Sequence, residues 1–158
     1  MRIAIGSDHG GYELKKKIIE FLTKRQIEYS EFGCMYGETY DYPDAAVEVC
    51  NYINNNKVSF GILICSTGIG INIAANKICG IRGALCSDKY SAQMAREHND
   101  ANVLCLGSRI IDSNLAIEIV NIFLDTKFSD ELRHKNRIQK ISELEHRFMD
   151  NEGVTHEV

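Results

Sequence analysis

The chain has 158 residues, a formal net charge of −4 and 44% hydrophobic residues. This length suits one domain that buries roughly two-thirds of its unfolded surface. The net negative charge and the scattered basic residues argue against nucleic acid or an anionic membrane as the main partner. No apolar run approaches the roughly 20 residues of a membrane-spanning helix, and the N-terminus reads as a strand rather than a signal peptide. We therefore expect a cytoplasmic protein that binds a small ligand.

Strand patterns and helix patterns alternate along most of the chain. In chain order we predict strand 3–6, helix 11–25, strand 28–32, helix 43–54, strand 60–65, helix 71–77, strand 81–86, helix 89–98, strand 103–106 and helix 113–125. Five strand–helix units of this kind predict a Rossmann-like α/β fold, in which helices cover both faces of a doubly wound, five-stranded parallel sheet. We assign residues 1–149 to this single domain.

The pattern changes at residue 129, where the last strand–helix unit has ended. Residues 129–149 predict a charged helix with a partial apolar stripe and no strand after it. Such a helix can cover its own domain or lie across a second subunit, so we expect a homodimer. The last residues, 150–158, are expected to form a flexible tail.

One of the six cysteines, Cys65, lies at the junction between a predicted strand and a predicted helix. Cys65 ends a short aliphatic strand, and the glycine-punctuated segment 66–70 leads from it into a helix. Open α/β sheets bind ligands at the carboxyl ends of their strands, where free amides at a helix start favour an anion. The same amides and helix end favour the thiolate form of a cysteine. We expect Cys65 to be reactive.

The remaining five cysteines are interpreted as buried apolar residues. They form no Cys-x-x-Cys pair and no Cys/His spacing suited to zinc, so we expect reduced thiols and no metal site. No nucleotide-binding motif is complete either, because Gly68-x-Gly70 is followed by alanines. We expect no cofactor.

Two further motifs follow the first two strands. Asp8 and His9 precede a pair of glycines, where Asp8 can orient the imidazole or simply cap the next helix. Tyr42 lies beside Pro43 in a segment that is otherwise typical of a proline-led helix start.

The last two groups contain histidine and arginine. His98 and Asn99 stand together at the end of a helix, where a histidine alone often only compensates the helix dipole. Arg133 and Arg137 are four residues apart on the final helix and hence on one face, and Arg109 follows the last strand. These guanidinium groups either belong to a solvated face or clamp a phosphate.

These motifs are similar to those of the family that holds type B ribose-5-phosphate isomerase and the galactose-6-phosphate isomerase subunits. The resemblance runs from Met1 to about Phe148. The matching segments are 7–11, 41–43, 62–70, 74–77, 80–82, 90–93 and 98–103, together with Arg133, His134 and Arg137.

The resemblance implies a reversible aldose–ketose isomerisation of D-ribose 5-phosphate and D-ribulose 5-phosphate in the pentose phosphate pathway, without a metal or nucleotide. Cys65 would move the proton between C1 and C2, and Thr67 would help to protonate the enediolate. Other members use a glutamate at the position of Ile71, which cannot act as a base. His98, assisted by Asp8, would open the sugar ring.

The resemblance also implies how the substrate is bound. The loop residues Ser66, Gly68, Ile69 and Gly70 would hold the enediolate oxygen, and Ser66 departs from the glycine of many relatives. Two subunits would share each active site. The remaining contacts implied are Tyr42 and Asn99 on the sugar and His9, Arg109, Arg133 and Arg137 on the phosphate.

Three alternatives stay open from the sequence. The substrate can be a six-carbon phosphate, such as allose or galactose 6-phosphate, bound at the same site. A non-catalytic phosphate- or nucleotide-binding module can use the same sheet, since fold alone does not fix function. The homodimer can also be part of a tetramer.

Overall fold

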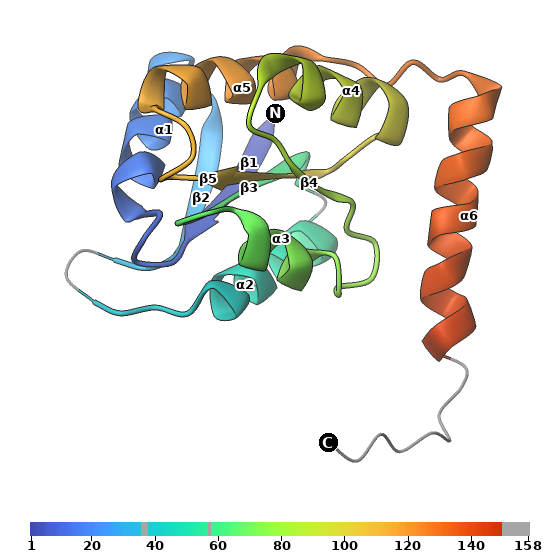
Figure 1. Ribbon diagram of the computed structural model, residues 1–158, viewed down its shortest axis with the longest axis horizontal. Helices are drawn as coiled ribbons and strands as arrows, with labels where there is room; N and C mark the ends of the chain where they lie inside the picture. The colour runs from blue at the N-terminus through green and yellow to red at the C-terminus, as the bar shows by residue number, and fades with distance from the viewer. Residues whose placement is uncertain (36–37, 57, 150–158) are drawn as a thin grey trace.

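The computed structural model describes residues 1–35, 38–56 and 58–149. A five-stranded parallel sheet forms the centre of the molecule (Figure 1). Its strands are β1 (Arg2–Ser7), β2 (Glu28–Gly33), β3 (Phe60–Cys65), β4 (Gly83–Leu85) and β5 (Val103–Gly107). The helices are α1 (Tyr12–Lys24), α2 (Tyr42–Asn56), α3 (Ile69–Ala75), α4 (Lys89–Asn99), α5 (Ser113–Asp125) and α6 (Leu132–Met149).

The strands lie in the order β2-β1-β3-β5-β4, and every pairing between them is parallel. The chain moves from β1 to β2 on one side and later crosses to β3 on the other side. The loops that follow β1 and β3 therefore diverge, and a doubly wound sheet opens a crevice at this switch point. Cys65 ends β3 at this crevice, next to the carboxyl end of β1.

Alternate residues along the strands belong to two hydrophobic layers, one on each face of the sheet. Ile62 and Ile64 pack with the buried residues of α1 and α5, whereas Leu63 and Cys65 pack with those of α2 and α3. Figure 1 shows the same division, with α1, α4 and α5 on one face of the sheet and α2 and α3 on the other. The near-continuous apolar runs of β1, β3 and β5 follow from burial on both faces. The predicted fold class is confirmed.

Four predicted elements differ from the structure by two or three residues at an end. Helix α6 begins at Leu132 and not at 129, α2 ends at Asn56 and not at 54, and the other two are β4 and α3. The fourth strand was expected over 81–86, but β4 covers only Gly83–Leu85. It starts late because the Arg82 N–H donates to the side chain of Asn102 (2.8 Å) and not to a strand. Helix α3 begins at Ile69, two residues before its predicted start, because Gly68 already adopts the turn that precedes the helix.

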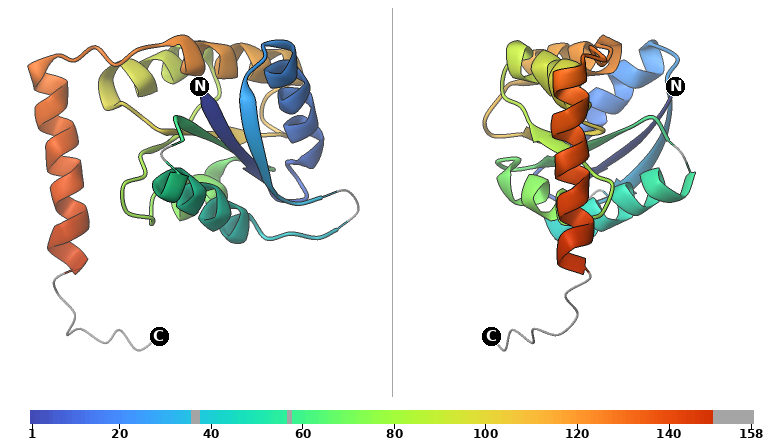
Figure 2. Two further views of the ribbon diagram at one scale, coloured as in Figure 1. Left: turned by 180° about the vertical axis from the view of Figure 1, so that it is seen from behind. Right: turned by 90° about the vertical axis from the view of Figure 1, so that its right-hand side faces the viewer.

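Helix α6 stands outside the two helix layers, beside the amino ends of the strands (Figures 1 and 2). Three residues before α6 begins, the Ser129 N–H donates to the Glu97 carbonyl of α4 (3.0 Å). Near its end, Glu145 accepts from the Gly80 N–H (3.0 Å) in the loop before β4. The predicted tail, 150–158, lies outside the described residues. Among the residues that the structure describes, no helix is long and apolar enough to cross a membrane.

Candidate active site

The thiol of Cys65 is held by the loop that follows it. The Gly68 N–H donates to the sulfur at 3.1 Å, and the side chain is 4% exposed. Gly68 has a φ of 76°, and a Cβ there would lie 2.8 Å from the Leu106 backbone carbon. The loop therefore needs glycine at this position to bring its amide onto the sulfur. A hydrogen bond of this kind stabilises a thiolate.

The other thiols lie in different surroundings. Burial raises the pKa of Cys50 to about 12 and that of Cys86 to about 11, and it raises the pKa of Cys105 as well. Burial, followed by the nearby Glu38, also raises the pKa of Cys34. A hydrogen bond to Glu145 raises the pKa of Cys79. These five cysteines are protonated at neutral pH. Four of them are buried as expected, but Cys79 is only partly buried, so the expectation is wrong for Cys79.

The loop after β1 lies directly beside the Cys65 loop. The Asp8 N–H donates to the Ile64 carbonyl (3.2 Å), so the two segments are joined just before the thiol. The Asp8 carboxylate is 7% exposed and accepts from the Gly11 N–H at 2.8 Å. It therefore closes the turn before α1, but it does not cap the helix, because Gly11 is the N-cap and no side chain accepts from the first turn. The same carboxylate lies at the carboxyl edge of the sheet, near the crevice.

The turn after β5 fixes the Cys65 loop from the other side. The Arg109 N–H donates to the Ser66 carbonyl (3.0 Å), and the Ser108 N–H donates to the Cys65 carbonyl (2.9 Å). The Ser108 hydroxyl donates to the Gly10 carbonyl at 2.6 Å, which joins this turn to the loop after β1. Thr67 uses its hydroxyl oxygen to accept from the Ile69 N–H (3.3 Å). Arg109 is exposed at this edge.

His9 and Tyr42 complete this edge. The His9 Nδ1 atom lies 3.1 Å from the Tyr40 carbonyl oxygen, to which it donates when Nδ1 carries the proton. The Tyr42 ring covers the start of α3, since a Cβ at Gly70 would lie 2.8 Å from it. Ten of the fourteen candidate residues thus gather at the carboxyl edge: Asp8, His9, Tyr42, Cys65, Ser66, Thr67, Gly68, Ile69, Gly70 and Arg109.

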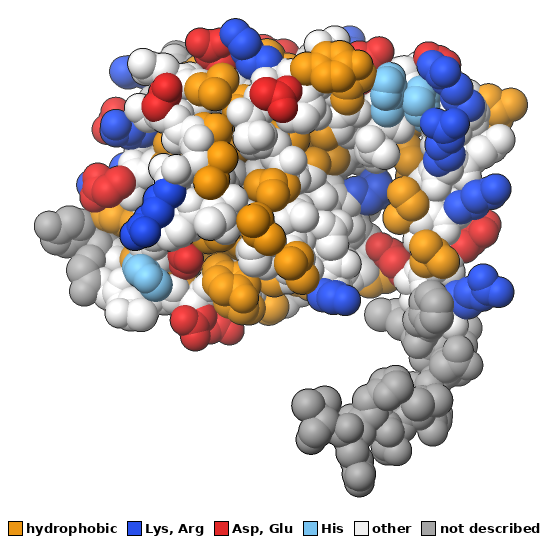
Figure 3. Space-filling view, viewed as in Figure 1, with side chains coloured by type: hydrophobic (Ala, Val, Ile, Leu, Met, Phe, Trp, Pro, Cys, Tyr) orange, Lys and Arg blue, Asp and Glu red, His pale blue; other side chains and the backbone are white. Residues whose placement is uncertain are grey.

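A second group lies at the opposite edge of the sheet. His98 and Asn99 end α4, and the His98 ring is stacked on the ring of His134 from α6, with centroids 4.3 Å apart. Arg133 forms an ion pair with Glu131 (2.7 Å), and Arg137 is exposed one turn further along α6. Figure 3 shows Lys and Arg side chains along the side of α6 that faces away from the sheet.

The two groups are separated by the length of a strand. Asn99 precedes β5 and Arg109 follows it, and the five residues of β5 span about 16 Å. In Figure 3 histidine side chains accordingly appear in two separate places, one where α4 approaches α6 and one at the lower left of the view. One chain therefore does not bring His98 to Cys65, or Arg133 and Arg137 to Arg109.

Several residues that organise the two groups were missed from the sequence. His134 lies between the two arginines of the final helix, and nothing in the sequence pattern indicates that its ring stacks on His98. Glu48 accepts from the Tyr40 hydroxyl (2.6 Å) and from the Gly33 N–H (2.9 Å), and so fixes the turn that holds His9. These contacts join segments that no periodicity relates.

A thiol under a glycine-rich amide loop, at the switch point of a doubly wound sheet, defines an α/β protein built to act on a small anionic substrate. Residues 3–141 match the family described as Ribose/Galactose Isomerase, and the chain belongs to this family.

Named relatives agree with the family match. The chain is 44% identical to "Ribose-5-phosphate isomerase B" of Escherichia coli, over 92% of this chain and 97% of the relative. It is 40% identical to "D-erythrulose-4-phosphate isomerase" of Pectobacterium atrosepticum, over 92% and 96%. The solved structure of ribose-5-phosphate isomerase B from Clostridium thermocellum matches with a TM-score of 0.91 and 48% identity, over 94% of this chain and 99% of that one.

Proposed function

We propose that this chain interconverts D-ribose 5-phosphate and D-ribulose 5-phosphate, with Cys65 as the base. The observation that carries the proposal is the bond from the Gly68 N–H to the Cys65 sulfur (3.1 Å) at the switch point of the sheet. The sulfur lies at the carboxyl end of β3, where the loop amides face the crevice. Relatives named for this reaction support the choice of substrate.

The sugar ring opens first. His98 and Asp8 divide two proton transfers: one group takes the proton of the anomeric hydroxyl, and the other protonates the ring oxygen as its bond to C1 breaks. The product is the open-chain aldehyde. Because these two residues lie at opposite edges of one chain, His98 of the partner subunit faces Asp8 in this mechanism.

Proton transfer between carbons follows. The Cys65 thiolate removes the proton from C2, and the negative charge moves to O1 as the enediolate forms. The Thr67 hydroxyl passes the O2 proton to O1, and Cys65 returns its proton to C1, which leaves the ketone at C2. The amides of the 66–70 loop stabilise the charged oxygen, and the loss of one such donor typically costs about 3 kcal/mol.

The phosphate is bound where the carboxyl edge of one subunit's sheet meets the amino edge of its partner's sheet. His9 and Arg109 of one chain and Arg133 and Arg137 of the partner subunit then surround it. Like charges four residues apart on a helix repel each other, and a dianion between them removes that cost. A homodimer with two shared active sites is therefore a condition of activity.

A second substrate class follows from the family itself. Its description includes galactose, and one relative is named for a four-carbon phosphate. All these substrates share the C1–C2 unit and a terminal phosphate, and they differ in the distance between the two. Allose 6-phosphate is the six-carbon substrate to compare.

The test is isomerisation of D-ribose 5-phosphate by the purified chain without added metal. We expect Cys65→Ala to lose at least about a hundredfold in kcat, which is the usual effect of removing a general base. Cys50→Ala is the matched control, because it removes a buried thiol whose pKa burial raises to about 12. Activity that survives in Cys65→Ala would refute the assignment of the base. Turnover of allose 6-phosphate alone would move the substrate to the hexose class.

A further inference from the structure

Helix α4 ends in an unusual residue, directly after His98 and Asn99. Asp100 has φ 44° and ψ 43°, in the left-handed region. Helices commonly end in this conformation, but the residue is usually glycine, because a Cβ is unfavourable there. An aspartate at this position suggests that its carboxylate has a use.

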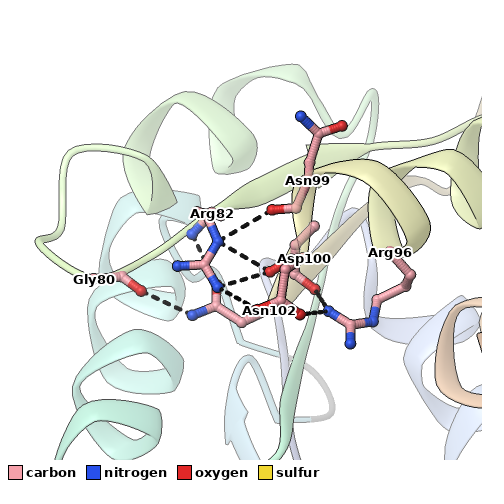
Figure 4. A network of polar contacts seen from close by, with 7 residues as sticks. Gly80, Arg82, Arg96, Asn99, Asp100 and Asn102 are labelled. Atoms are coloured by element: carbon pink, nitrogen blue, oxygen red, sulfur yellow. Dashed lines mark hydrogen bonds and ion pairs between the residues drawn. The ribbon is translucent and has the colours of Figure 1, made fainter. Parts of the chain in front are cut away.

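The Asp100 carboxylate is held by two guanidinium groups, one on each oxygen (Figure 4). Arg82 donates to Oδ2 at 3.0 Å, and Arg96 donates to Oδ1 at 2.8 Å. Arg96 is 7% exposed and also donates to the Ala101 carbonyl at 2.6 Å. Its guanidinium lies 4.5 Å from the centre of the Phe60 ring, so it is fixed by packing as well. Charge-assisted bonds of this kind are short and directional.

Arg82 also holds the backbone of the last turn of α4. Its guanidinium donates to the Asn99 carbonyl (3.2 Å) and to the Asp100 carbonyl (2.8 Å). Figure 4 shows the Asn99 side chain pointing away from these contacts. The network therefore fixes the backbone of the turn and leaves that amide available for a ligand.

The same network reaches α6. The Asn102 side chain accepts from the Arg82 N–H (2.8 Å) and donates to the Gly80 carbonyl (2.8 Å). The Gly80 N–H in turn donates to Glu145 of α6 (3.0 Å). The two elements that carry the His98–His134 stack are thus joined a second time, through Asp100 and its partners.

We propose that Asp100 is a positioning residue, whose carboxylate fixes the last turn of α4 so that His98 and Asn99 meet the sugar bound at the partner subunit. This inference rests on the proposed role of His98 in ring opening. A plain helix cap would need the left-handed turn but neither of the two guanidinium bonds.

The key variant is Asp100→Gly, which suits the left-handed turn and removes only the carboxylate. Its matched control is Gln26→Gly, because Gln26 is exposed, follows α1 and also has a positive φ, 56°. We expect Asp100→Gly to stay folded at the assay temperature, with a lowered melting temperature because the buried Arg96 loses its carboxylate. We also expect it to lose kcat on D-ribose 5-phosphate by about tenfold or more, since small misplacements of catalytic groups carry such costs. KM should change little, and Gln26→Gly should retain wild-type kcat.

A second readout does not depend on turnover. The imidazole proton signals of His98, assigned by their loss in His98→Ala, should shift in Asp100→Gly and stay in place in Gln26→Gly. Wild-type kcat together with unshifted signals in Asp100→Gly would overturn the proposal. If Asp100→Gly does not fold, Asp100→Asn takes its place under the same two criteria.

The inference and the function on which it rests fail separately. Wild-type activity in His98→Ala would remove the ring-opening role, whatever Asp100 does. Under that result, shifted His98 signals in Asp100→Gly would still support positioning, and unshifted signals would overturn it.

Discussion

The imidazole rings of His98 and His134 lie nearly parallel, 8° apart, with their centroids separated by 4.3 Å. His134 is 4% exposed, and its Nε2 atom has no hydrogen-bond partner among the described residues. Burial lowers the pKa of His134, and the neighbouring His98, Arg133 and Arg137 lower it further, against an opposite effect of Glu131. The neutral imidazole is therefore the form that the folded chain prefers.

This environment predicts a loss of stability in mild acid. Because the pKa of His134 is lower in the folded chain than its ordinary value, about 6.5, the unfolded chain binds more protons below that pH. The free energy of unfolding should then decrease as the pH falls below about 6.5. His134→Phe keeps a flat ring against His98 but does not titrate, so its urea midpoint should depend less on pH. Equal pH dependence in the two proteins would contradict this explanation.

The surroundings of Cys65 and Cys79 predict the order in which these two thiols are alkylated. Cys79 is more exposed than Cys65, but the bond to Glu145 raises the pKa of Cys79. If reactivity follows the thiolate, iodoacetamide should modify Cys65 before Cys79, and bound substrate should protect Cys65. Peptide mass spectrometry after short exposures measures the order. Faster labelling of Cys79 would indicate that exposure governs the reaction and that Cys65 is not a thiolate.

The fold was predictable from the sequence because each strand and helix has a local signal. We could predict β3 and β5 from their apolar runs alone. The bounds of α5, 113–125, were predicted in full, again without information from distant residues. The position of Cys65 at the end of β3 followed from the same signals. The strand order, in contrast, depends on which apolar faces pack best, and no local pattern contains it.

Contacts between distant segments explain what the sequence could not predict. The role of Asp100 was not predicted, because Arg96 is a local partner four residues earlier and the fold alone brings Arg82 to the same carboxylate. Glu48 looks like any exposed carboxylate on a helix until the Tyr40 turn is seen beside it. His98 gave a partial signal, since a residue before β5 must lie at the amino edge of a parallel sheet. That placement separates it from Cys65 within one chain.

The separation of Cys65 from His98 within one chain predicts that two inactive variants regain activity when they are mixed. In a mixed dimer of Cys65→Ala and His98→Ala chains, one site has both residues and the other has neither. Random pairing makes half of the dimers mixed, so activity should return to about one quarter of the wild-type value. Co-refolding the two variants and assaying D-ribose 5-phosphate measures the recovery.

The control for this experiment pairs Cys65→Ala with Asp8→Asn. Both residues lie at the carboxyl edge of the same chain, so no arrangement of these two chains contains an intact site. We expect no recovery from this mixture. Recovery here, or none in the first mixture, would contradict the division of the site between two chains.

The turn that holds His9 predicts a selective effect on substrate binding. The Tyr40 hydroxyl donates to Glu48 (2.6 Å), and this bond, followed by burial, raises the pKa of Tyr40 to about 12. The hydroxyl therefore remains a donor across the working pH range. The same residue's carbonyl lies 3.1 Å from the His9 ring. Loss of the hydroxyl should loosen the phosphate contact of His9 without touching Cys65.

We expect Tyr40→Phe to raise KM for D-ribose 5-phosphate about fivefold, which corresponds to about 1 kcal/mol for one hydrogen bond. The value of kcat should be nearly unchanged, because the proton-transfer residues stay in place. Tyr52→Phe is the matched control: its hydroxyl accepts from Ser30 (3.0 Å), away from the turn that holds His9. If Tyr40→Phe lowers kcat and leaves KM unchanged, the turn acts on the chemistry and His9 does not bind the phosphate.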